Sequence, residues 1–194
     1  MCQQNEIEQD LTSDGSKILA ALLQDSCRTG ARNVQVIADE RGFIYQDDGP
    51  GLRDLADFAV LINQEAAHQK DDGRKPTLPT GCSLHLLLAH PEVEIVTLSS
   101  NTLSLSLNAR RWRADRQYVT NWRDQLARIC FPAPGMNLGV TCTKELTERF
   151  IQALTDVIQA SLGCSVLLYT IINGQIVELA ATDGTATGRL SCQK

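Results

Sequence analysis

The sequence lacks the features of several large protein classes. Its seven cysteines are an odd number and none forms a CxxC pair, so neither a disulfide framework nor a zinc site is expected. Its longest apolar runs, such as residues 86–89, are far too short to cross a membrane. The polar, acidic N-terminus is unlike a signal peptide. We therefore expect a reduced, cytoplasmic protein that makes no membrane contact.

Catalytic and metal-binding groupings are also missing. The three histidines, His68, His85 and His90, have no metal-ligand spacing, and no Ser-His-Asp arrangement stands out. A net charge of −5 argues against nucleic-acid binding by the whole surface. What is present is a globular composition, because 194 residues, 43% of them hydrophobic, are enough for one domain with a proper core.

Hydrophobic periodicity predicts helices that alternate with hairpins. Two neighbouring strands are expected to turn at Asn101, and the "PAPG" of residues 132–135 is expected to break the chain. Hairpins without regular βαβ units indicate an α+β fold, a two-layer sandwich with one mostly antiparallel sheet and helices on one face. The predicted helices span 13–29, 53–68, 82–90 and 143–161, and the predicted strands span 33–39, 43–46, 92–100, 102–109, 136–143, 164–172 and 175–182, with another near 116–122.

One domain is predicted over residues 13–182, between a loose arm at 1–12 and a polar tail at 183–194. Within it, residues 69–81, "QKDDGRKPTLPTG", are rich in charge, glycine and proline and have no periodicity. Long loops of this kind inside compact domains are typically functional lids or disordered. We expect a lid at 69–81.

The stretch "DDGPGL", residues 47–52, lies between a strand-like run and a helical run. It is a strand-to-helix corner with an acidic pair, Asp47 and Asp48, at its tip. The helix before it ends in "DSCRTGA", residues 25–31, and leads into the preceding strand. Corners of this kind often hold ligands.

This order of motifs resembles the ATP-binding domain shared by DNA gyrase, heat-shock chaperones, histidine kinases and MutL, called the GHKL superfamily or Bergerat fold. The resemblance covers residues 16–181 and is closest to the MutL and chaperone branches. It implies that Asp47 accepts a hydrogen bond from the exocyclic amine of adenine. It also implies that Gly49 and Gly51 let the backbone lie against the base.

The same resemblance implies ATP or ADP with Mg²⁺ as the ligand. Asp25 stands where the family has a magnesium-coordinating Asn, and a carboxylate oxygen is a suitable magnesium ligand. The lid and the helix start after it are implied to cradle phosphate. The family's Gly-Thr strand motif corresponds to Gly139-Val140, with Thr141 one place further on. The implied nucleotide-binding residues are Asp25, Asp47, Gly49, Gly51, Lys75, Gly81 and Thr141, and Asp25 is also the implied metal ligand.

The chain departs from the family at the position of its catalytic base. The ATP-hydrolysing branches carry a Glu one helical turn before the metal Asn, and this chain has Ala21 there. The second glycine motif keeps only Gly81. No catalytic residue is assigned, and we expect ATP hydrolysis to be weak or absent. The protein is then expected to act as a conformational switch that regulates a protein partner.

Other functions stay open at this point. The same fold with an empty pocket could serve as a scaffold or inhibitor, and kinship with MutL and gyrase suggests an accessory role in DNA transactions. One basic cluster suits a partner-protein surface better than a nucleic acid, because acidic residues interrupt it. Family members often dimerise through arms such as residues 1–12, so a homodimer is also open. The cluster consists of Arg110, Arg111, Arg113, Arg116, Arg123 and Arg128, interleaved with Trp112, Tyr118 and Trp122.

Overall fold

The computed structural model of the protein describes residues 14–62, 82–115, 118, 122–158, 165–172 and 175–182. The predicted arm, lid and tail, at 1–12, 69–81 and 183–194, lie outside these ranges. So does the part of the predicted second helix beyond residue 62.

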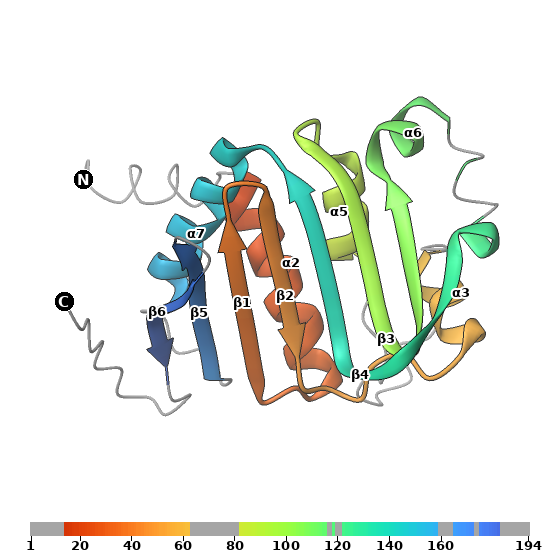
Figure 1. Ribbon diagram of the computed structural model, residues 1–194, viewed down its shortest axis with the longest axis horizontal. Helices are drawn as coiled ribbons and strands as arrows, with labels where there is room; N and C mark the ends of the chain where they lie inside the picture. The colour runs from red at the N-terminus through yellow and green to blue at the C-terminus, as the bar shows by residue number, and fades with distance from the viewer. Residues whose placement is uncertain are drawn as a thin grey trace, which may run out of the picture.

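The described residues form two layers, with the sheet in front of the helices in Figure 1. The sheet has six strands in the order β3-β4-β2-β1-β5-β6, and all neighbouring pairs are antiparallel except β1 and β5. The predicted α+β two-layer sandwich is therefore confirmed. The main elements are α2 (Asp14–Thr29), β1 (Asn33–Asp39), β2 (Gly42–Asp47), α3 (Leu55–Ile62), α5 (Cys82–Ala89), β3 (Val93–Asn108), α6 (Ala109–Ala114), β4 (Leu126–Cys142), α7 (Lys144–Ile158), β5 (Ser165–Ile172) and β6 (Gln175–Thr182).

The core lies between the sheet and the helical layer. The apolar stripe of α2 is buried, as its periodicity predicts, and includes Ile18 and Leu22. On α7, Phe150 is buried and stacks on Phe43 of β2, with ring centroids 3.9 Å apart and planes 4° apart. These contacts fix α2 and α7 against the centre of the sheet.

The predicted turn at Asn101 is wrong, because β3 runs through this residue as one strand from Val93 to Asn108. Asn101 has a positive φ of 51°, and the register with β4 shifts on both sides of it. Asn tolerates this backbone conformation better than most residues. The residue therefore marks an irregularity inside a strand, where the sequence suggested the end of one.

The predicted break at "PAPG" is also wrong, because β4 continues through residues 132–135. Ser99 and Asn101 of β3 pair with Asn137 and Ala133 of β4, so β4 carries extra residues here and bulges. Gly135, with φ 65°, lies in this bulge. Proline and glycine in a strand mark a bulge as readily as a strand end.

The basic, aromatic-bearing stretch after β3 folds differently from the prediction. Residues 109–114 form helix α6, whose cap is Asn108, and Trp122 begins a short 3₁₀ helix that extends to Gln125. The predicted strand near 116–122 otherwise falls mostly outside the described residues. Among the described helices, none is both long and apolar enough to span a membrane.

Replacing Phe150 by alanine should destabilise the fold strongly. The substitution removes the stacked ring between α7 and β2 and leaves a cavity, which typically costs about 3–5 kcal/mol of unfolding free energy. Urea denaturation measures the loss. Glu148→Ala, at an exposed position on the same helix, should change stability by no more than about 0.5 kcal/mol. Similar losses in the two variants would show that the α7 packing is not as described.

Candidate functional site

The corner at residues 47–52 is held together by the carboxylate of Asp47, whose side chain points into the helical layer and is 5% exposed. Its Oδ2 accepts a hydrogen bond from Ser26 Oγ on α2 at 2.7 Å. Its Oδ1 accepts from the backbone N–H groups of Gly49 at 3.0 Å and Met136 at 3.1 Å. One side chain thus ties helix α2, the corner and strand β4 together.

The hydroxyl of Ser26 is shared between two partners. It gives its single proton to Asp47, so the contact of 2.9 Å to the hydroxyl of Tyr45 has tyrosine as the donor. Both Ser26 and Tyr45 are buried. This series of hydrogen bonds, from Tyr45 to Ser26 and from Ser26 to Asp47, fixes the orientation of the Asp47 carboxylate.

The side chain of Asp48 points away from that of Asp47 and has a different structural role. Its Oδ1 accepts from the backbone N–H groups of Arg32 and Asn33, and its Oδ2 accepts from Asn33 Nδ2. Partial burial opposes the negative charge of Asp48, but the hydrogen bonds from Asn33 and Arg32 outweigh it and lower the pKa of the carboxyl below its ordinary value of 3.8. Of the acidic pair, Asp47 therefore points inward, whereas Asp48 points outward. We call the hydrogen bonds that Asp48 accepts from Arg32 and Asn33 a clamp, because they hold the start of β1.

Two glycines make the corner possible by close backbone approach. Gly51 has φ 65°, and a Cβ there would lie 2.3 Å from Ser100 Oγ. Gly135 also has φ 65°, and a Cβ there would lie 1.8 Å from the carbonyl oxygen of Asp47. Ser100 joins the two sides, because its Oγ accepts from Leu52 N and donates to Gly135 O. The corner therefore packs directly against the bulge in β4.

Asp25 lies on α2 immediately before Ser26 and faces the start of α5. Its side chain is 1% exposed, and its Oδ2 accepts a hydrogen bond from Ser83 Oγ at 2.7 Å. Ser83 belongs to the first turn of α5, the helix that follows the predicted lid. The structure therefore brings the predicted metal residue to the helix start that the resemblance assigns to phosphate.

The donor set at this point suits magnesium in kind. A carboxylate and a hydroxyl are hard oxygen ligands, which Mg²⁺ prefers. Among the described residues, no group of three or more His, Cys, Asp or Glu side chains could hold a metal ion by itself. Phosphate oxygens and water, which Mg²⁺ commonly keeps beside one or two carboxylates, could complete the coordination of an ion at Asp25 and Ser83.

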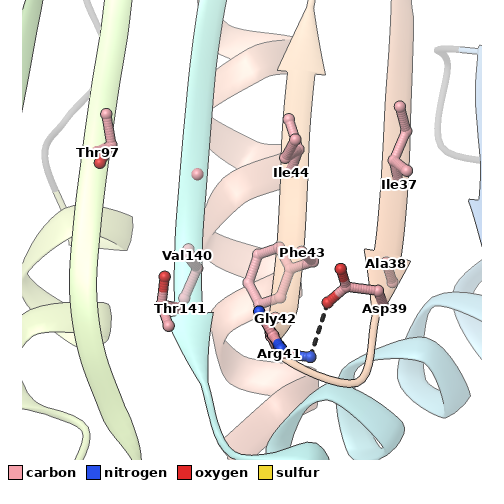
Figure 2. A pocket seen from close by; sticks show the side chains of 11 residues that line it. Ile37, Ala38, Asp39, Arg41, Gly42, Phe43, Ile44, Thr97, Val140 and Thr141 are labelled. Carbon is pink, nitrogen blue, oxygen red and sulfur yellow. Dashed lines mark hydrogen bonds between the residues drawn. The ribbon is translucent and has the colours of Figure 1, made fainter. Parts of the chain in front are cut away.

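Thr141 does not join the other predicted residues. It pairs with Gly42 at the end of β2 that is far from Asp47. Its side chain lies on the open face of the sheet, because the alternation of β4 buries Val140 and Cys142 instead. Figure 2 shows Thr141 near Gly42, among the residues that line a pocket of about 230 Å³ on that face.

The remaining predicted positions divide between described and undescribed parts of the chain. Lys75 and Gly81 lie outside the described residues. Ala21, at the position of the family's general base, is half-buried on α2 one turn before Asp25. A Cβ at Gly49 would lie 3.2 Å from Asp47 Oδ1 and 3.3 Å from Thr29 Oγ1. Asp25, Asp47, Gly49 and Gly51 thus gather around the C-terminal half of α2 and the corner.

Several residues of the site were missed in the sequence, among them Ser26, Ser83 and Gly135. Ser26 is in the apolar stripe of α2, so nothing in the sequence indicated a role for its hydroxyl in the site. Ser83 stands in the first turn of a helix, where serine is common. Gly135 was interpreted as part of a chain break. Only Gly135 carried a usable signal, since a glycine in a strand often marks close backbone approach.

Comparison with known proteins adds no family assignment. The chain matches no protein-family model, and no curated protein is significantly similar to it. The GHKL resemblance therefore depends on the residues and contacts described above.

Gly135→Ala should destabilise the protein far more than Gly139→Ala on the same strand. A methyl group at residue 135 would overlap the backbone of Asp47, and the positive φ adds strain. At residue 139 the nearest atom to a new methyl group is Thr97 Cβ at 3.8 Å. We expect a loss of about 3 kcal/mol or more for the first and less than about 1 kcal/mol for the second, measured by urea denaturation. Equal losses would contradict the packing of the corner on β4.

Asp48→Asn should flatten the acid dependence of stability. The folded pKa of Asp48 lies below its unfolded value, so its stabilising effect is present above about pH 4 and is lost as pH falls through the folded pKa. Urea unfolding at several pH values between about 7 and 3 should therefore show a smaller acid loss in the variant than in the parent. Identical pH profiles would mean that the clamp on Arg32 and Asn33 does not hold in solution.

Proposed function

We propose that the protein is a cytoplasmic GHKL-like domain that binds an adenine nucleotide at the Asp47 corner and regulates a protein partner. The observation that carries this proposal is the hydrogen-bonding capacity of Asp47. An ionised carboxylate offers about four acceptor positions. The described donors Ser26, Gly49 and Met136 use one position each. One position is left on Oδ2, which matches a single N–H of the adenine amine.

A carboxylate at this place favours adenine over guanine. The amine of adenine donates a hydrogen bond, whereas guanine presents an acceptor oxygen at the equivalent position. An ionised carboxylate only accepts hydrogen bonds, so Asp47 has no hydrogen to offer the oxygen of guanine. The same corner should therefore reject GTP.

The phosphate side of the proposal involves Asp25 and Ser83. The start of α5 is suited to anions by its helix dipole and its first N–H groups. However, the carboxylate of Asp25 contacts that same first turn through Ser83. A phosphate there would meet a negative charge unless Mg²⁺ lay between them, so binding should depend on magnesium.

Hydrolysis is expected to be slow or absent because Ala21 cannot accept a proton from water. A nucleotide that binds without rapid turnover acts by favouring one conformation over another. The regulated partner would then respond to nucleotide occupancy, as in a switch.

A second candidate is a scaffold or inhibitor with no nucleotide. One observation favours it: Asp47 already has three protein donors, so the corner is structurally complete without a ligand. In that case Asp47 serves only to bind α2, the corner and β4 to one another.

Titration calorimetry with ATP, in the presence and absence of Mg²⁺, should separate the two candidates. We expect ATP and a non-hydrolysable analogue to bind equally, only with magnesium, and Asp47→Asn to weaken binding about tenfold or more. The Asn oxygen can still accept from Gly49 and Met136, and its amide can donate to Ser26, but it cannot accept the adenine amine. Asp48→Asn is the matched control and should leave binding unchanged.

The contrary outcomes are distinct. Absence of binding by a folded parent protein would favour the scaffold. Equal binding by the parent and the Asp47→Asn variant would show that Asp47 does not recognise the nucleotide. Rapid phosphate release would show that another group replaces the missing base.

A further inference from the structure

We propose that a cavity beside the start of α3 binds an acidic peptide segment of a partner protein that also carries an aliphatic side chain. The cavity has a volume of about 510 Å³, within the usual range for ligand sites. It lies between the start of α3, the middle of β3 and the first residues of β4. We call it the arginine cavity, and the described residues that line it are Arg53, Asp54, Leu55, Thr102, Leu103, Arg123, Leu126, Ala127 and Arg128.

Part of the basic cluster noted in the sequence is used inside the fold. The guanidinium of Arg113 donates to the backbone carbonyls of Leu88, His90, Pro91 and Val93, which fastens α6 to the end of α5. That arginine is structural, and this leaves fewer cluster members for a ligand.

Arg110 is likewise engaged, in an ion pair with Glu94 of β3. Two other members of the cluster, Arg123 and Arg128, form no ion pair with any described residue. Folding places them together on one side of the arginine cavity. The cluster thus separates into a structural part and a part that faces the cavity.

The cavity gains a third arginine from a distant part of the sequence. Arg53 lies between the corner and α3, and its guanidinium is 3.6 Å from Asp57, which partly neutralises it. Asp54 accepts from the N–H groups of Ala56 and Asp57, so it caps α3. The lining therefore keeps a positive balance, which suits a ligand with more than one carboxylate.

The floor of the cavity is apolar. Leu55 is 49% exposed, an unusual degree for a large aliphatic side chain, and Leu103 and Leu126 are half-buried beside it. A purely ionic ligand would leave this surface in water. A peptide with an aliphatic residue next to its carboxylates would cover it and pair with the arginines.

A single-stranded nucleic acid fits the cavity less well. Binding of that kind uses exposed aromatic rings on which bases stack. Trp122 is only 4% exposed, and the guanidinium of Arg123 lies 5.7 Å from the centre of its ring. Among the described residues that line the cavity, none is aromatic.

Within the described part of the chain, no residue that lines the arginine cavity belongs to the proposed nucleotide site. Peptide binding at the cavity can therefore be measured without ATP, and either proposal can fail without the other. The inference goes beyond the proposed function because it names the surface and the chemistry of a partner.

Fluorescence anisotropy with the full chain tests the proposal. The probe is a fluorescein-labelled peptide, GELEELEDL, at low salt, and a second probe has serine in place of each leucine. We expect the first peptide to bind and the second to bind much more weakly. Arg128→Glu should weaken binding of the first about tenfold or more, because it replaces an attraction by a repulsion.

The matched control is Arg111→Glu, which makes the same change of charge at an exposed position on α6, outside the cavity. It should leave binding within about twofold, since exposed charges at a distance are largely screened. Arg123→Glu gives a second test in case Arg128→Glu does not fold, and thermal melts check both variants.

Several results would overturn the proposal. Absence of binding by the leucine-containing peptide would do so, as would equal binding of the serine-containing peptide. Equal weakening by Arg111→Glu and Arg128→Glu would show nonspecific attraction. A fluorescein-labelled oligo(dT) that binds more tightly than the peptide would assign the cavity to nucleic acid instead.

Discussion

The architecture around the site depends on one buried carboxylate. Asp47 accepts hydrogen bonds from α2, from its own corner and from β4 at the same time. A buried charge is tolerated only where polar partners replace the water that it has lost. The local structure supplies them: Ser26 is aligned by Tyr45, the corner turns at Gly51, and the bulge at Gly135 brings the N–H of Met136 within reach. The loss of any of these partners would leave the carboxylate under-satisfied.

The parts of the fold with a clear period could be predicted from the sequence. The stripe of α2, the alternation of β1 and β2, and the amphipathic α7 each follow one pattern from end to end. The acidic corner could also be recognised, because glycine on either side of proline stops the strand. These segments are set by local side-chain chemistry, and they include both candidate ligand residues, Asp25 and Asp47.

The remaining features could not be predicted, because they depend on pairing between distant segments. Neither the passage of β3 through Asn101 nor that of β4 through Gly135 is visible until the two strands are laid side by side. The strand register also decides that Thr141 faces away from Asp47. Arg53 and Arg128 both line the arginine cavity, an arrangement that no spacing in the sequence indicates.

The most direct measurement is a crystal structure of the protein grown with a non-hydrolysable ATP analogue and Mg²⁺. The account predicts the adenine amine at hydrogen-bonding distance, about 2.7–3.2 Å, from Asp47 Oδ2, with the ion beside Asp25. A base held elsewhere, or a crystal in which saturating nucleotide leaves the corner unchanged, would contradict it.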